Sequence, residues 1–146
     1  LYKPGTVIDL ATLTGAVVGA LAHTYSGVFT PEKSLWKDLK KSGDKSGQPG
    51  WRLPLHPDFA RAVKGKVADL KNLAGQPGAS TAAEFLHTFI KPATKWAHLD
   101  IAGTAIPASG IANGMAVRWL NQFVADHFED KDIKMPPKPQ PGPKPA

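Results

Sequence analysis

The sequence predicts an α/β fold in which a mixed sheet is flanked by helices. Short apolar segments that suit strands are separated by longer segments whose apolar residues recur at helical spacing. Their order along the chain is strand, helix, strand, helix, a mixed stretch, helix, strand and helix. Strands that alternate with helices in this way indicate a layered α/β domain and not a bundle or a sandwich. The 146 residues suffice for one hydrophobic core.

The first predicted unit is a strand, a tight turn and a helix within residues 7–21. Val7 and Ile8 belong to an apolar, partly β-branched run, which gives way to small residues at 11–16. In open α/β sheets, ligands bind at the carboxyl ends of the strands. Residues 12–15 therefore form a candidate binding turn.

Two interpretations of this turn stay open at the level of the sequence. Gly15 would let backbone groups approach a ligand closely, because glycine has no side chain to obstruct it. Alternatively, the segment is a plain strand-to-helix turn that Thr14 caps, since threonine is common at helix N-caps for local reasons.

A second strand is expected at residues 25–29 and a second helix after it. Leu35, Trp36 and Leu39 give this helix an apolar stripe. The glycine-rich segment 43–50 should end it, because glycine is a poor helix former.

The middle of the chain is less regular. Residues 51–55 should be extended, with Trp51 and Leu53 packed inward, and a short helix is expected at 57–64. The Gly- and Pro-rich segment 72–78 is predicted to be a surface or active-site loop.

The last three elements are a helix, a strand and a helix. Thr81 and Glu84 have the spacing of a capping box, which predicts that a helix opens there. Residues 96–103 have the period of a strand and should be buried, and residues 115–128 form an amphipathic helix. We expect residues 1–130 to form one domain and the Pro- and Lys-rich residues 131–146 to form an extended tail.

Composition limits the partners. The formal charge is +6, but the lysines are spread along the chain with few aromatic residues among them, which favours a solvated basic face over a nucleic-acid platform. Nucleic acid stays a possible but less favoured partner. No apolar run reaches about 18 residues, so no membrane partner is expected. The absence of cysteine excludes disulfides and thiolate metal sites.

Three carboxylates and one histidine are candidates for chemistry. Asp9, Asp69 and Asp100 lie in or beside predicted strands, and His98 shares a strand face with Asp100. Such side chains can ligate divalent metals, so a two-metal hydrolase site is conceivable. We favour structural roles as hydrogen-bond acceptors, because no ligand-spacing motif such as His-Glu-x-x-His is present.

Other catalytic motifs are absent from the sequence. There is no Gly-x-Ser-x-Gly nucleophile elbow and no glycine-rich phosphate loop. The residues alone therefore predict no self-sufficient active site.

Six segments, taken in order, resemble one family, the leucyl aminopeptidases, also called cytosol aminopeptidases. The segments are VIDLATLTGA at 7–16, SGVF at 26–29, WRLPL at 51–55, VADLKN at 67–72, STAAEFL at 80–86 and WAHLDIAGTA at 96–105. The resemblance covers about residues 5–128. It implies that the chain is the C-terminal part of the catalytic domain of such an enzyme.

The resemblance implies a hexameric exopeptidase that removes N-terminal residues, often leucine, from peptides. In this family two divalent ions, zinc or manganese, activate a water for attack on the peptide carbonyl. Their ligands and the catalytic lysine and arginine belong to an Asn-Thr-Asp-Ala-Glu-Gly-Arg motif and to a lysine-containing segment before it, both upstream of the first block. This sequence contains neither. We therefore expect no catalytic and no metal-binding residue here, an inactive isolated chain, and the upstream part of the same protein as a partner.

What the resemblance assigns to this chain is substrate positioning. Thr12, Leu13 and Gly15 match the family's substrate-holding turn. Ala102 and Ala105 match positions that close the pocket for the first side chain of the substrate, and Leu73 matches a position that faces the leaving side of the substrate.

The family default is a cytoplasmic location, with mitochondria or another organelle as the alternative. An alternative function is a non-catalytic scaffold derived from the family, or a basic assembly protein that associates with nucleic acid.

Overall fold

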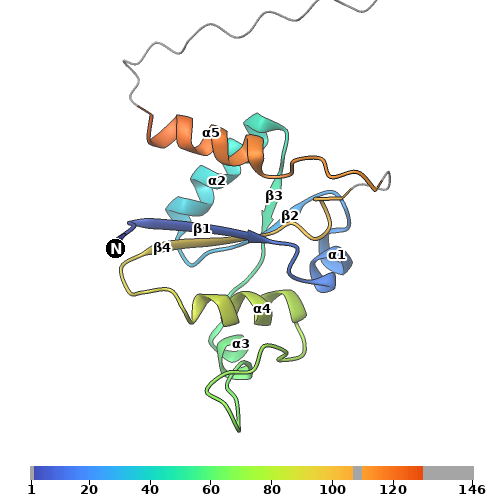
Figure 1. Ribbon diagram of the computed structural model, residues 1–146, viewed down its shortest axis with the longest axis vertical. Coiled ribbons are helices and arrows are strands. Elements are labelled where there is room, and N and C mark those ends of the chain that lie inside the picture. The colour runs from blue at the N-terminus through green and yellow to red at the C-terminus, as the bar shows by residue number, and fades with distance from the viewer. Residues whose placement is uncertain (1, 107–109, 130–146) are drawn as a thin grey trace, which may run out of the picture.

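The computed structural model describes residues 2–106 and 110–129, and it confirms a mixed sheet flanked by helices (Figure 1). The predicted tail at 131–146 lies outside the described residues. In chain order the elements are β1 (Thr6–Ala11), α1 (Gly15–Leu21), β2 (Ser26–Phe29), α2 (Lys33–Ser46), β3 (Gly50–Arg52), α3 (Pro57–Ala62), α4 (Gly78–His87), β4 (Lys95–Asp100) and α5 (Val117–His127).

The sheet has the strand order β1-β4-β2-β3. β4 pairs with β1 in parallel and with β2 in antiparallel fashion, and β2 pairs with β3 in parallel. β4 is thus a central strand, and its residues Trp96 to Asp100 are all buried, as its sequence predicted. In Figure 1 the sheet lies between α2 and α5 on one face and α3 and α4 on the other, with α1 beside the strand ends.

The α2/α5 face of the sheet is packed around Trp119. This side chain is fully buried, and its indole Nε1–H donates to the carbonyl of Leu39 at 2.7 Å. Glycines make room for it: a Cβ at Gly43 would lie 2.9 Å from Cε2 of Trp119, and a Cβ at Gly50 would overlap the same ring. The core here consists of Val28, Leu35, Leu39, Ala97, Leu99, Ala116, Trp119 and Phe123.

This packing explains one wrong prediction. The second helix was expected to end before the segment 43–50, but α2 continues through Gly43 and ends at Ser46. Gly47 follows it in the left-handed conformation that is common directly after a helix. The close approach of Trp119 requires glycine at position 43, so a tertiary contact overrides the low helix propensity of that residue.

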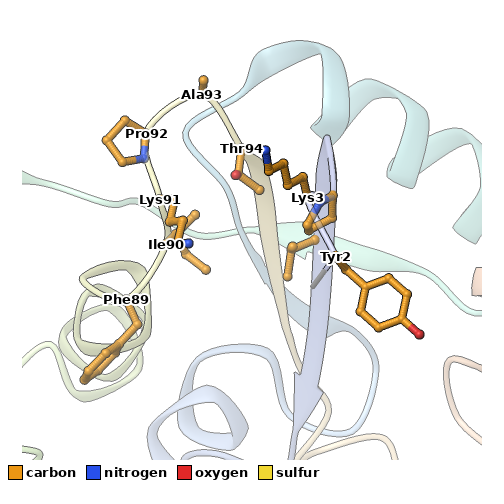
Figure 2. A pocket seen from close by; sticks show the side chains of 10 residues that line it. Tyr2, Lys3, Phe89, Ile90, Lys91, Pro92, Ala93 and Thr94 are labelled. Carbon is orange, nitrogen blue, oxygen red and sulfur yellow. The ribbon is translucent and has the colours of Figure 1, made fainter.

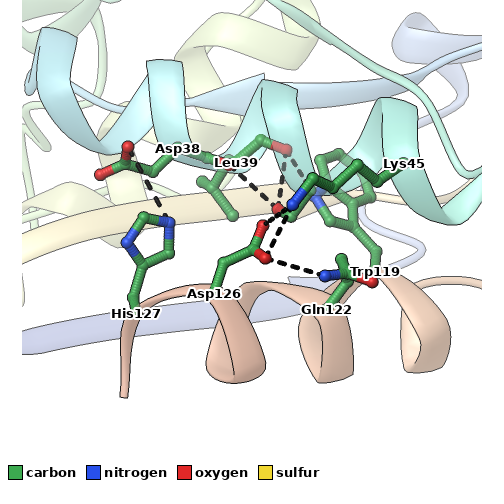
Figure 3. A network of polar contacts seen from close by, with 8 residues as sticks. Asp38, Leu39, Lys45, Trp119, Gln122, Asp126 and His127 are labelled. Carbon is green, nitrogen blue, oxygen red and sulfur yellow. Dashed lines mark hydrogen bonds and ion pairs between the residues drawn. The ribbon is translucent and has the colours of Figure 1, made fainter. Parts of the chain in front are cut away.

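Polar contacts at the surface also join α2 to α5 (Figure 3). Lys45 Nζ lies 2.8 and 2.9 Å from the two carboxylate oxygens of Asp126, which also accepts from Gln122 at 2.9 Å. The Lys45 ammonium, as the largest contribution, holds the pKa of the Asp126 carboxyl below its ordinary value.

The α1/α4 face has a separate core. It consists of Val17, Phe29, Ala79, Ala83 and Trp96. α4 begins at Gly78, three residues before the predicted start, so the expected capping box at Thr81 and Glu84 is wrong. Glu84 is instead buried inside the helix and accepts a hydrogen bond from the amide of His56 at 2.9 Å, which joins α4 to the segment before α3.

The prediction for Trp51 is also wrong. The segment around it is extended as expected, but β3 is an edge strand and 53 % of the Trp51 surface is exposed.

Within the described ranges, no helix has both the length and the apolar character that a bilayer crossing requires.

Candidate functional site

The turn between β1 and α1 is the centre of the candidate site. β1 ends at Ala11 and α1 begins at Gly15. Thr14 is the N-cap of α1: it has extended backbone angles, and its Oγ1 accepts from the amide of Val17 at 3.1 Å. The N-cap that the sequence predicted at Thr14 is therefore present, in agreement with the interpretation of this segment as a strand-to-helix turn.

A buried carboxylate holds the turn in place. Asp100, at the end of β4, is fully buried. It accepts hydrogen bonds from the Leu13 amide at 3.1 Å and from the Thr14 hydroxyl at 2.7 Å, and from the Ala102 amide at 3.2 Å. These bonds compensate the cost of burying the group. Asp100 thereby fixes the turn to the neighbouring strand.

Beside the turn lies a cavity of about 700 Å³. The loop before α4 and one face of α4 form its other walls. The lining residues are Leu13, Thr14, Gly15, Ala16, Asn72, Leu73, Ala74, Gly75, Gln76, Gly78, Thr81, Ala82, Phe85 and Leu86. The structure therefore brings together three of the residues that the resemblance assigned to substrate positioning, namely Leu13, Gly15 and Leu73.

The character of this cavity suits an apolar group. A Cβ placed at Gly15 would meet no atom within 4 Å, so the absence of a side chain keeps open space at this wall. Leu73 is 85 % exposed, and Phe85, which also lines the cavity, is partly buried. Pockets of this kind select among aliphatic and aromatic groups by volume.

The remaining assigned residues do not line this cavity. Thr12 is exposed in the same turn. Ala102 packs against the core of the α1/α4 face, and the amide of Ala105 donates to the carbonyl of Ile101 at 2.9 Å. Both alanines thus lie just beyond the carboxyl end of β4, in the segment that Asp100 joins to the turn.

Asp9 and His98 form a second polar cluster, on the same face of the sheet as Asp100. Asp9 Oδ2 accepts from the Trp96 indole N–H at 2.6 Å, and Asp9 Oδ1 lies 2.5 Å from Nδ1 of the fully buried His98. Because a carboxylate only accepts, Nδ1 of His98 carries the proton in this pair. These contacts agree with structural roles for both side chains.

The residues that are described form no metal site. Over residues 2–106 and 110–129, no three His, Asp or Glu side chains gather in a way that could hold a metal ion. Asp9 and Asp100 are occupied by the hydrogen bonds given above, and Asp69 lies exposed in the segment after α3. The donor set of a pair of divalent ions is thus not found in this part of the chain.

Several lining residues were missed from the sequence. Phe85 was not singled out from the sequence, Leu86 was interpreted only as part of the apolar face of a helix, and Asn72 and Gln76 were interpreted only as part of a loop. The loop's Gly and Pro content did indicate a surface or active-site segment, but nothing in the sequence showed which wall of which cavity it would form.

Comparison with known proteins decides the family. Residues 1–121 match the model of the cytosol aminopeptidase family, catalytic domain. The chain belongs to this family. The resemblance carried by the six sequence segments is thereby confirmed.

Relatives of this cytosol aminopeptidase family member are much longer. A probable cytosol aminopeptidase of Xanthobacter autotrophicus is 48% identical over 135 residues, which cover 88% of this chain and 27% of the relative. One from Afipia carboxidovorans is 47% identical, with 89% and 27% covered. The structure of a mutant of tomato leucine aminopeptidase superposes with a TM-score of 0.81 at 35% identity, covering 84% of this chain and 25% of that one. The chain therefore spans about a quarter of the length of these proteins.

Proposed function

We propose that this chain is the substrate-positioning part of a leucyl aminopeptidase, which hydrolyses N-terminal residues, often leucine, from peptides. Membership of the cytosol aminopeptidase family supports the peptidase activity. The observation that carries the role of this chain is the cavity beside the turn, where Leu13, Gly15 and Leu73 meet.

In this proposal the two divalent ions, zinc or manganese, are held by residues outside the chain. The described residues do not fit them, since no suitable group of His, Asp and Glu side chains is present over residues 2–106 and 110–129. The contribution of this chain is to hold the substrate: the turn offers backbone groups, and the cavity accepts an apolar side chain. The working enzyme would be a homo-hexamer, as the sequence resemblance implies. It would act in the cytoplasm, in keeping with the names of its relatives.

A chimera tests the proposal directly. The matched segment of the Xanthobacter autotrophicus relative is replaced by this chain, and cleavage of leucine p-nitroanilide is measured with manganese or zinc. We expect the chimera to turn over substrate and the isolated chain to be inactive. Clear turnover by the isolated chain would contradict the division of roles, and an inactive but folded hexameric chimera would contradict the proposed function.

A substitution at Gly15 tests the cavity. Gly15→Ala places a methyl group in open space at the cavity wall, so folding should be unaffected or slightly favoured while the room for a ligand decreases. In the chimera, kcat/KM for leucine relative to alanine substrates should fall about 10-fold, the lower end of the effect of one methylene in a hydrophobic pocket.

Gly19→Ala is the matched control for this substitution. Gly19 lies on the same helix and does not line the cavity, and a Cβ placed there would also meet no atom within 4 Å. Equal leucine-to-alanine ratios for the two variants and the unsubstituted chimera would remove this cavity from the substrate site.

A further inference from the structure

We infer that His23, which does not line the cavity, is a positioning residue for substrate selection: it holds the C-terminal end of α1 and thereby fixes the turn at the other end of that helix. This inference rests on the proposed function, because it takes the cavity beside the turn as a substrate site. It adds a residue that acts on the cavity from outside it.

The ring of His23 binds the segment that follows β4. Its Nδ1 lies 2.6 Å from the carbonyl oxygen of Gly103. Because a carbonyl only accepts, Nδ1 carries the proton in this contact. His23 follows the end of α1 at Leu21, and Gly103 follows the end of β4 at Asp100. The hydrogen bond therefore joins the C-terminal end of α1 to the carboxyl end of the central strand.

Two further contacts close the same junction. The hydroxyls of Ser26 and Thr104 lie 2.7 Å apart, and Ser26 is buried. The backbones also lie directly against each other, because a Cβ at Gly103 would overlap the carbonyl oxygen of Ala22. The chain between α1 and β2 thus holds the segment after β4 through side chains and backbone together.

The backbone of Ala22 indicates that this junction is under constraint. Ala22 has φ 51° and ψ −139°, a conformation that favours glycine. A residue keeps such a conformation only when its surroundings hold it there. The surroundings here include the close contact with Gly103 and a hydrogen bond from the Ala22 amide to the carbonyl of Val18 at 2.8 Å. Strain of this kind is often found where the position of a functional segment matters.

α1 is bound at both of its ends to the segment after β4. At the first end, the hydroxyl of Thr14 donates to Asp100 at 2.7 Å, and at the other end His23 donates to Gly103. Asp100 also accepts from the Ala102 amide, so both anchors belong to one short, hydrogen-bonded segment. A helix of seven residues does not hold its place by itself. Loss of the His23 anchor would therefore let α1 pivot about Thr14.

Such a pivot would change the cavity, because the first residues of α1 form part of its wall. Gly15 and Ala16 line the cavity, and so does Gly78, the first residue of α4. α1 and α4 meet closely here, since a Cβ at Gly78 would lie 3.1 Å from the Cβ of Ala16. In a close fit, a small displacement of one wall alters the room for an apolar side chain.

Hydrogen exchange in the isolated chain tests the positioning role without any need for activity. His23→Ala should accelerate exchange of the Leu13 amide, which donates to Asp100, and of the Ala105 amide by about 10-fold or more. His23→Asn should leave both rates unchanged, because asparagine offers an N–H at the place of Nδ1. Thr24→Ala, at the next exposed residue, is the matched control and should also leave them unchanged.

A second hollow provides the internal reference for this experiment. It has a volume of about 410 Å³ and is lined by residues 2–4, Val7 and the segment 89–94, none of which belongs to the turn or to α1 (Figure 2). The amide of Ile90 in this lining donates to the carbonyl of His87 at 3.1 Å, and its exchange should be the same in every variant. Unchanged exchange of Leu13 in His23→Ala, or equal acceleration at Leu13 and Ile90, would overturn the inference.

Substrate choice in the chimera described above is the second measurement. In His23→Ala, kcat/KM for leucine relative to alanine substrates should fall about 10-fold, because a displaced wall contacts the larger side chain less well. His23→Asn should restore the parent ratio. If His23 had only a structural role, His23→Ala would lower cleavage of both substrates equally, and an unchanged ratio would remove the role in selection.

The two measurements separate this inference from the proposed function. A parent chimera that is inactive, together with accelerated exchange of Leu13 in His23→Ala, would reject the proposed function and keep the positioning of the turn by His23. A parent chimera that is active, with unchanged exchange of Leu13 in His23→Ala, would do the reverse.

Discussion

The two faces of the sheet are stabilised by different means. The α2/α5 face is packed by a continuous apolar core around the fully buried Trp119. The α1/α4 face carries the buried ionisable side chains of the described residues, namely Glu84, His98 and Asp100, and it also carries the cavity. Both faces thus have an apolar core, but the α1/α4 face also carries buried ionisable groups, one of which fixes the turn beside the cavity.

The largest expected effect concerns the packed face. Trp119→Ala should lower the free energy of unfolding by about 4 kcal/mol, because it empties a fully buried site that two glycines shape. Urea denaturation followed by circular dichroism measures this change. Trp51→Ala, on the exposed edge strand, is the matched control and should cost less than about 1 kcal/mol. Equal costs for the two substitutions would contradict the role given to the Trp119 core.

An intermediate effect is expected on the polar face. Asp100→Ala leaves the Leu13 and Ala102 amides and the Thr14 hydroxyl without their acceptor, and should cost about 3 kcal/mol. Exchange of the Leu13 amide should accelerate more than exchange in α5. Asp44→Ala, at an exposed carboxylate of α2, serves as the control and should cost less than about 1 kcal/mol. If the Leu13 amide were unaffected, Asp100 would not be what holds the turn.

The smallest effect is expected at the surface pair of Lys45 and Asp126. The pKa of Asp126 is lowered in the folded protein, so its stabilisation is present above the unfolded value of about 3.9 and is lost as the pH falls through the folded pKa. Lys45→Gln should therefore reduce stability slightly at neutral pH, and the difference from the parent should vanish in strong acid. The midpoints of urea denaturation, measured from neutral pH to strong acid, give the difference in stability between Lys45→Gln and the parent. Lys37→Gln is the control. A difference that stays constant with pH would show that the pair is not its origin.

Sequence reasoning succeeded where local chemistry decides the structure. The apolar runs predicted the strands, and Thr14 caps α1 as its residue type suggests. It failed where distant segments decide. The helix continues through Gly43, where the close packing of Trp119 leaves no room for a side chain. Glu84 accepts a hydrogen bond from the His56 amide and does not cap the start of its own helix.

The same limit applies to the candidate site. The resemblance pointed to Leu13, Gly15 and Leu73, and the structure places them around one cavity. It gave no indication of Phe85, because a helical aromatic residue has the same spacing whether it faces a core or a cavity. Which walls meet depends on how α4 and the loop before it lie against the turn, and that arrangement arises from tertiary packing.

The position of Asp100 has a consequence for the order in which the protein takes shape. The hydrogen bonds that fix the turn join Leu13 and Thr14 to a carboxylate that lies 87 and 86 residues later. Closing so long a loop has an entropic cost that local contacts do not have. During synthesis the turn leaves the ribosome well before its anchor has been translated. The wall of the cavity is therefore made early and becomes rigid late, only after β4 has joined the sheet.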